Sequence, residues 1–235
     1  MRRINLPRPT IFALLALGAV VPYARATAIT YTNSSSFDAA TSALSTQTFT
    51  GVASDVGVGP GGNTSVSNPL DRSTNGGMLP GLTINATPNV PYGIAVLGPD
   101  YLGSDLTNYS VFGSYLGSGL DFTLGPAMTA ASLDLLTLNG SANVDITVFD
   151  PSDVSLGNFI VTGVPSSGSG VFWGITVSGD TIGSIDITVP SEHFVGIDQV
   201  QFGSAAAVTP EPSSLWLLGS GLLGLLGAAG RKAKV

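Results

Sequence analysis

The sequence predicts an all-β fold, an antiparallel β-sandwich formed by residues 29–207. Three observations support this prediction. The segment is rich in Thr, Ser, Val, Ile, Gly and Asn, which favour strands and turns over helices. Short alternations of apolar and polar residues recur every ten to fifteen residues, with Gly, Pro, Asn or Asp between them. No fixed repeat is present, so a solenoid is disfavoured and two facing sheets are the economical arrangement.

The chain begins with the features of a secretory signal peptide, residues 1–28. A basic start is followed by the apolar run Ile11–Val21, and then by two small-x-small sequences, Ala24-Arg25-Ala26 and Ala26-Thr27-Ala28. We therefore expect export, with cleavage at Ala26 or Ala28. The basic residues are Arg2, Arg3 and Arg8.

One short helix is expected early in the domain. Ser36 can cap the segment Phe37–Thr41, and Asp38 would lie near the positive end of the helix. A strand is expected over Thr46–Thr50. The following stretch, Gly51–Asn75, is rich in glycine, so we expect a long loop without a strand ladder.

The rest of the domain is expected to be a series of short strands. In Val144–Val148 and Ile185–Val189 every second side chain is apolar, so one face of each strand packs inward. The side chains that face water are Asp145, Thr147, Asp186 and Thr188. The expected strands are Leu82–Ile84, Gly93–Leu97, Tyr109–Tyr115, Leu120–Leu124, Ala131–Leu138, Val144–Phe149, Asn158–Val164, Val171–Val177, Ile182–Val189 and Ile197–Phe202.

The last stretch, residues 208–235, has three parts. Pro210 and Pro212 have a fixed φ and no backbone N–H, so they hold Glu211 extended and outside any helix. Residues 215–230 are uncharged and mostly apolar, and basic residues then close the chain. A helical run of about 15 residues spans roughly 22 Å against a hydrocarbon core of roughly 30 Å, so we expect a short, single transmembrane helix.

The order of Pro210-Glu211-Pro212, apolar span and Arg231-Lys232 resembles the PEP-CTERM sorting signal of exported Gram-negative proteins. In that family a membrane-embedded exosortase recognises the Pro-Glu-Pro region and removes the tail. The resemblance implies that these three residues are a processing signal and that an exosortase-type enzyme is a partner. It also implies anchoring in the membrane, then display at the cell surface or release. A plain C-terminal anchor is the alternative.

The closing strand Gly196–Phe202 and the strand layout resemble the jelly-roll sandwiches often attached to such tails. This resemblance implies a jelly-roll-like fold and a structural calcium ligand at Asp198. Asp150 and Asp153 also place two carboxylates in one turn, although no Asp-x-Asp-x-Asp-Gly loop exists. We hypothesise one calcium ion near Asp198 and expect no other cofactor. The alternatives are a turn-forming role for the Asp150–Asp153 pair and a solvent-facing Asp198.

Charge and cysteine content exclude several classes of function. Arg72 is the only basic residue between the two terminal segments and is accompanied by fourteen acidic residues, so the exported part has a net charge near −13. One cationic side chain cannot neutralise phosphates, which excludes nucleic acid and anionic lipid surfaces as partners of the domain. The absence of cysteine excludes thiol nucleophiles and thiolate metal sites.

The sequence offers no nucleophile with a base in a recognisable arrangement. His193 is the only histidine, no Gly-x-Ser-x-Gly elbow is present, and the domain has no lysine. Carboxylate pairs of the glycosidase kind are available, but most of the acids are Asp at strand or turn positions, where solubility accounts for them. We therefore expect a protein without catalytic activity.

Two functions fit these observations. The first is a non-catalytic surface or extracellular-matrix protein associated with exopolysaccharide or biofilm. The alternative is a carbohydrate-binding jelly-roll module, in which exposed aromatic rings would be the platforms. Ice binding would require a regular Thr array, which the sequence lacks. Tails of this kind are also called ice-binding protein C-terminal segments, but that name does not indicate ice binding by the domain. The candidate platforms are Trp173, Tyr92, Tyr101, Tyr109 and Tyr115.

Overall fold

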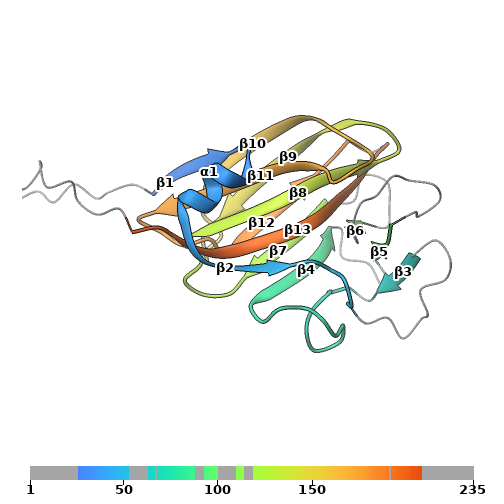
Figure 1. The fold of residues 1–235 in the computed structure, drawn as a ribbon, viewed down its shortest axis with the longest axis horizontal. Helices are drawn as coiled ribbons and strands as arrows, with labels where there is room; N and C mark the ends of the chain where they lie inside the picture. Colours follow the sequence, from blue (N-terminus) through green and yellow to red (C-terminus); the bar gives the residue numbers. More distant parts are fainter. Residues whose placement is uncertain are drawn as a thin grey trace, which may run out of the picture.

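A computed structural model describes residues 26–52, 63–66, 68–87, 93–99, 110–113, 119–190 and 192–207. Their regular structure is almost entirely β, and the strands pair in antiparallel fashion within two sheets. The two sheets face each other across a shared apolar core (Figure 1). The predicted antiparallel β-sandwich is therefore confirmed.

The larger sheet contains eight strands among the described residues, in the order β1-β11-β8-β13-β6-β5-β3, with β2 also paired to β13. The last strand is central. One edge of β13 pairs with β8, and its other edge pairs first with β6 at Gly196 and Ile197 and then with β2 from Val200 to Ala205. The bounds are β1 Thr27–Tyr31, β2 Thr41–Gln47, β3 Asn63–Val66, β5 Ile94–Leu97, β6 Ser110–Gly113, β8 Ala130–Leu138, β11 Val171–Ser178 and β13 Phe194–Ala205.

The smaller sheet contains five strands in the order β10-β9-β12-β7-β4. Its two edge strands are β10 and β4, and the pairing of β10 with β9 is interrupted by two register shifts. The bounds are β4 Leu82–Thr87, β7 Gly119–Leu124, β9 Ala142–Phe149, β10 Ser155–Val164 and β12 Ser184–Thr188.

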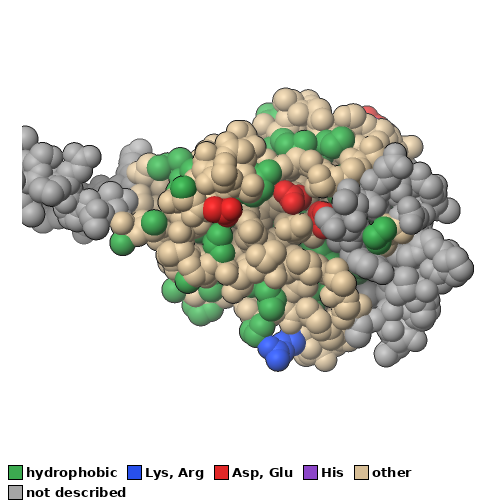
Figure 2. Space-filling view, viewed as in Figure 1, with side chains coloured by type: hydrophobic (Ala, Val, Ile, Leu, Met, Phe, Trp, Pro, Cys, Tyr) green, Lys and Arg blue, Asp and Glu red, His purple; other side chains and the backbone are tan. Residues whose placement is uncertain are grey.

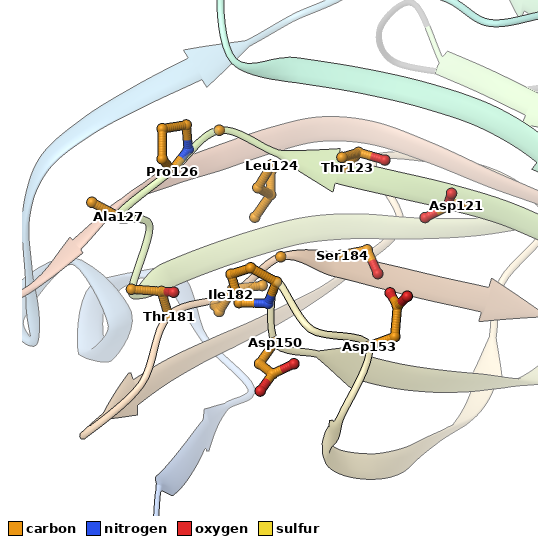
Figure 3. A pocket seen from close by; sticks show the side chains of 13 residues that line it. Asp121, Thr123, Leu124, Pro126, Ala127, Asp150, Asp153, Thr181, Ile182 and Ser184 are labelled. Atoms are coloured by element: carbon orange, nitrogen blue, oxygen red, sulfur yellow. The ribbon is translucent and has the colours of Figure 1, made fainter.

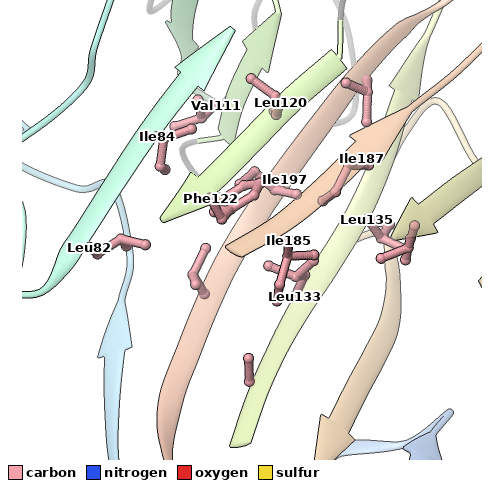
Figure 4. Close-up of a cluster of buried hydrophobic side chains, with 14 of the residues drawn as sticks. Leu82, Ile84, Val111, Leu120, Phe122, Leu133, Leu135, Ile185, Ile187 and Ile197 are labelled. Carbon is pink, nitrogen blue, oxygen red and sulfur yellow. The ribbon is translucent and has the colours of Figure 1, made fainter. Parts of the chain in front are cut away.

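The core forms where the inward faces of the two sheets meet. Leu133 and Leu135 of β8 pack in the same cluster as Phe122 of β7 and Ile185 and Ile187 of β12 (Figure 4). Each of these side chains is at most 1% exposed. Burial of an aliphatic or aromatic side chain of this size contributes about 1.5–3 kcal/mol, so the alternation of apolar residues is what holds the sheets together.

The predicted early helix exists but begins sooner than expected. Helix α1 spans Ser34–Ala39 and is capped by Asn33, whose Oδ1 accepts a hydrogen bond of 2.9 Å from the backbone N–H of Ser36. Ser36 as the cap was therefore wrong. Phe37 fixes the helix on the larger sheet, because its buried ring packs against the rings of Tyr31 and Phe172.

Two expectations for residues 41–75 need correction. The strand predicted over 46–50 is β2 at Thr41–Gln47, since the chain pairs with β13 directly after the helix. The expected loop over 51–75 contains β3, which pairs with β5. Leu70 also forms a bridge to Ile84. The short run Asn63–Val66 contains no Gly or Pro, so its backbone can pair despite the glycines around it.

Most of the predicted signal peptide and the whole tail lie outside the described residues. This applies to residues 1–25, to Pro210-Glu211-Pro212 and to the predicted transmembrane helix 215–230. Within the part of the chain that the structure describes, no helix is both long and apolar enough to cross a membrane.

The pairing of β1 leads to a prediction about the mature N-terminus. Thr27 pairs with Ser178, Ala28 pairs with Val177, and the Ala28 side chain packs against the core. We expect cleavage after Ala26, because cleavage after Ala28 would remove two of the five paired residues of β1. Intact-mass measurement of the exported protein should give Thr27 as its first residue. A chain beginning at Ile29 would contradict this prediction.

Candidate functional site

A row of polar side chains crosses the outward face of the smaller sheet. Cross-strand partners connect Asn85 of β4, Asp121 of β7, Asp186 of β12, Thr147 of β9 and Asn158 of β10. We call these five residues the polar row. Each alternates with an inward apolar neighbour, so burial of the core fixes their outward direction. The strand register therefore builds a continuous line of hydrogen-bonding groups across all five strands.

The two carboxyl groups of the polar row are electrostatically coupled. Burial, followed by the charge of Asp186 and a hydrogen bond shared with it, raises the pKa of Asp121 to about 6. Asn85 also donates a hydrogen bond to Asp121, which acts in the opposite direction. Burial raises the pKa of Asp186 as well, and the charge of Asp153 adds to that rise. The centre of the row therefore holds a proton more readily than ordinary surface carboxylates.

A pocket of about 460 Å³ adjoins the polar row and shares Asp121 with it. Asp121, Ser184 and Asp153 line one part of this pocket (Figure 3). The carboxylate of Asp150 serves its own turn instead, since Oδ1 accepts hydrogen bonds of 2.8 Å from the N–H groups of Ser152 and Val154. This is the turn-forming alternative stated for Asp150. The pocket also has apolar lining residues, including Leu124, Pro126 and Ile182, so its carboxyl and hydroxyl groups lie beside apolar side chains.

A second, smaller groove of about 180 Å³ lies on the outward face of the larger sheet. Asp134 of β8, Phe172 of β11 and Gln199 of β13 line it, and Ser132 donates a hydrogen bond of 2.8 Å to Gln201 beside them. Burial and then the charge of Asp198 raise the pKa of Asp134 to about 6. On the face shown in Figure 2 the remaining described surface is mostly neutral, with scattered acidic groups.

Asp198, the predicted calcium ligand, lies in β13 as expected but is 1% exposed, so the solvent-facing alternative was wrong. The β13 register shifts between Ile197 and Val200, opposite Asp134 of β8. The carboxylates of Asp198 and Asp134, like the amide and hydroxyl groups near them, offer oxygen atoms, which are the ligands that a hard cation such as calcium prefers. No group of three or more His, Cys, Asp or Glu residues suited to a metal is found among the described residues. The calcium site remains a prediction.

The other candidate residues, the single histidine and the aromatic platforms, do not come together in one site among the described residues. His193 lies in the turn before β13, 3.9 Å from the Glu192 carboxylate, and its side chain is only 15% exposed. Trp173 is 4% exposed and packs against Phe159 with ring centroids 5.8 Å apart, so it is a core side chain and not an exposed platform. The remaining aromatic candidates, Tyr92, Tyr101, Tyr109 and Tyr115, lie outside the described residues.

Sequence reasoning identified only part of the polar row. Asp186 and Thr147 were predicted to face water, but Asn85, Asp121 and Asn158 were not singled out. Alternation within Leu82–Thr87 and Gly119–Leu124 could have shown that Asn85 and Asp121 point outward. Their alignment depends on strand order and register, which no single strand encodes.

The C-terminal end of the chain matches a known sorting motif. Residues 208–232 match the PEP-CTERM protein-sorting motif. The chain therefore carries a PEP-CTERM sorting signal, which supports export of the protein, and Pro210, Glu211 and Pro212 fall within the matched residues.

No curated protein matches the chain. Among solved structures it is similar to CBM86, a low-affinity xylan-binding module from Roseburia intestinalis, with 18% identity, a TM-score of 0.28, and coverage of 40% of this chain and 76% of that one. It is similar to a family 29 carbohydrate-binding module with 14% identity, a TM-score of 0.30, and coverage of 74% of this chain and 99% of that one. It is also similar to a family two carbohydrate esterase from Cellvibrio japonicus, with 15% identity, a TM-score of 0.26, and coverage of 55% of this chain and 37% of that one.

The Asp121–Asp186 pair predicts that stability depends on pH. Because the folded-state pKa of Asp121 is about 6, against 3.8 for an ordinary Asp, the folded protein binds more protons than the unfolded chain between about pH 4 and 6. The free energy of unfolding should therefore rise as the pH falls through this window. Asp121→Asn should raise stability at pH 7 by about 1 kcal/mol and flatten the profile.

Urea unfolding between pH 4 and 8 measures this effect. Asp145→Asn, which neutralises an exposed carboxylate on β9, is the matched control and should leave the profile unchanged. Because the pKa of Asp134 is raised as well, the Asp121 variant should still gain some stability as the pH falls. A wild-type protein more stable at pH 7 than at pH 5 would contradict the prediction.

The calcium hypothesis predicts a metal-dependent melting temperature. Excess EDTA should lower the melting temperature and excess calcium should restore it, because a ligand that binds only the folded state stabilises it. Asp198→Asn should abolish the response to calcium, whereas Asp38→Asn, an exposed carboxylate in α1, should retain it. If EDTA leaves the wild-type melting temperature unchanged, calcium is not a structural ligand.

Proposed function

We propose that this protein is a non-catalytic surface or extracellular-matrix protein of a Gram-negative bacterium, with a jelly-roll-like domain that associates with exopolysaccharide. The observation that carries the proposal is the position of the sorting motif. It begins at residue 208, and the last strand of the sandwich ends at Ala205. The motif thus follows the last strand that the structure describes, which is the arrangement expected when the domain is the cargo and the tail is removed.

The polar row supports association with a polysaccharide. It offers amide, hydroxyl and carboxyl groups on an open sheet face, and these are groups that can donate to or accept from sugar hydroxyls. With strands about 4.8 Å apart, five strands spread the row over roughly 19 Å. An extended chain can therefore contact several row residues at once. This feature also favours the alternative of a carbohydrate-binding module, without aromatic stacking on Trp173.

The absence of catalysis is part of the proposal. His193 has a carboxylate neighbour, Glu192, at 3.9 Å, but both lie between β12 and β13 and neither belongs to the polar row. The coupled carboxyls Asp121 and Asp186 are neighbours that share a hydrogen bond. Glycosidases of either stereochemical class instead hold their two carboxyl groups at least about 5 Å apart, on opposite sides of a scissile bond.

Substitution in the tail tests the sorting part of the proposal. Combined replacement Pro210→Ala, Glu211→Ala and Pro212→Ala should leave the full-length chain in the membrane fraction, because the recognition segment is lost. Val154→Ala, at an exposed position in the turn between β9 and β10, is the control and should be processed normally. Fractionation with immunoblotting of the domain measures this, and normal release of the triple variant would contradict sorting by the tail.

Polysaccharide co-sedimentation tests the role of the polar row. With exopolysaccharide extracted from the producing bacterium, Asn85→Ala and Asn158→Ala should each weaken binding roughly threefold to tenfold, the cost of about one hydrogen bond. Thr46→Ala, an exposed position on β2 of the other sheet, should bind like the wild type. Equal binding by all four proteins would exclude the polar row as the binding face.

A further inference from the structure

Both ends of the domain meet at one end of the sandwich. β1 begins where Thr27 pairs with Ser178, the last residue of β11. Just beyond β13, the backbone N–H of Ala206 donates a hydrogen bond of 2.8 Å to the carbonyl of Ala40. Figure 1 shows the start of β1 and the end of β13 at the same end of the molecule. The chain therefore enters and leaves the domain beside a single surface.

This surface contains an uncharged groove of about 300 Å³, which we call the terminal groove. It is lined by Ile29 and Tyr31 of β1, Ala40 after α1, and the segment Ala205–Ala207. Ile29 is 54% exposed, one of the largest exposures of an apolar side chain among the described residues. No side chain that lines the groove is charged, although the domain as a whole is strongly acidic.

The link between the domain and the Pro-Glu-Pro segment is short, so an enzyme that binds this segment is held near the terminal groove. Pro210 lies five residues beyond Ala205, and five extended residues span about 18 Å at most. An enzyme that binds Pro210, Glu211 and Pro212 is therefore held within about 18 Å of the end of the sandwich from which the tail leaves. The surface at that end of the domain is the part of the sandwich nearest to the enzyme.

We propose that the terminal groove is the docking surface for the membrane-embedded peptidase that processes the tail. This inference rests on the proposed function, because it requires that the Pro-Glu-Pro segment is processed. The partner surface is apolar and uncharged, to match Ile29 and Ala205–Ala207. Docking would hold the tail in register with the active site, so the folded domain contributes to recognition together with the motif.

Processing in cells tests the contact directly. Ile29→Glu should lower the fraction of processed chain roughly tenfold relative to the wild type, because it places a charge in the docking surface. Ile160→Glu, on β10 of the other sheet at 62% exposure, is the matched control and should be processed normally. Both variants are first compared with the wild type by thermal melting, and Ile29→Ser replaces Ile29→Glu if the latter does not fold.

A flexible spacer between the domain and the tail distinguishes an effect of docking on processing from an effect on recognition of the motif. Twelve Gly and Ser residues inserted between Ala207 and Val208 allow a peptidase to reach Pro210 without touching the domain. The Ile29→Glu defect should then disappear. If Ile29→Glu without the spacer is processed like the wild type, or if Ile29→Glu and Ile160→Glu are slowed equally, the docking proposal is overturned. If the wild-type tail is not processed at all, the proposed function itself fails.

Thiol labelling distinguishes the peptidase from the lipid bilayer as the occupant. The chain has no cysteine, so Ile29→Cys introduces a unique thiol. A membrane-impermeant maleimide should label this position in cells that lack the peptidase, and an inactive peptidase that retains the unprocessed chain should protect it. Ile160→Cys should be labelled in both strains. Protection of position 29 in both strains would assign the groove to the bilayer and overturn the proposal.

Discussion

Burial of two apolar sheet faces against each other is the interaction on which the rest of the structure depends. Because side chains alternate along a strand, burying Phe122, Ile185 and Ile187 also fixes the outward direction of Asp121 and Asp186. The paired carboxyls are therefore a consequence of core packing. Their mutual repulsion costs about 1 kcal/mol or less, which is small beside the burial of the core side chains.

The central position of β13 connects the fold to the tail. This strand pairs with β8, β6 and β2, so the larger sheet is complete only when residues up to Ala205 are in place. The sorting motif begins at residue 208, after the last of these pairings. Removal of the tail within the motif thus leaves every described strand pairing intact, as a removable signal requires.

The sequence predicted the fold class and most strands, because apolar alternation is a local signal and the core is built from it. Helix α1 was found but its cap was misplaced by three residues, since Asn33 and Ser36 are both good caps and only the observed hydrogen bond distinguishes them. The polar row and the burial of Asp198 could not be predicted, because both depend on register between strands far apart in the chain. The tail was recognisable because its signal is carried by contiguous residues.

The central claim is that a folded acidic sandwich is delivered and its tail is discarded. The mass of the intact protein recovered from the cell surface and the medium tests this most directly. The account predicts a chain that ends near Pro210–Pro212 and lacks the apolar segment 215–230. A recovered protein that still ends at Val235 would contradict it.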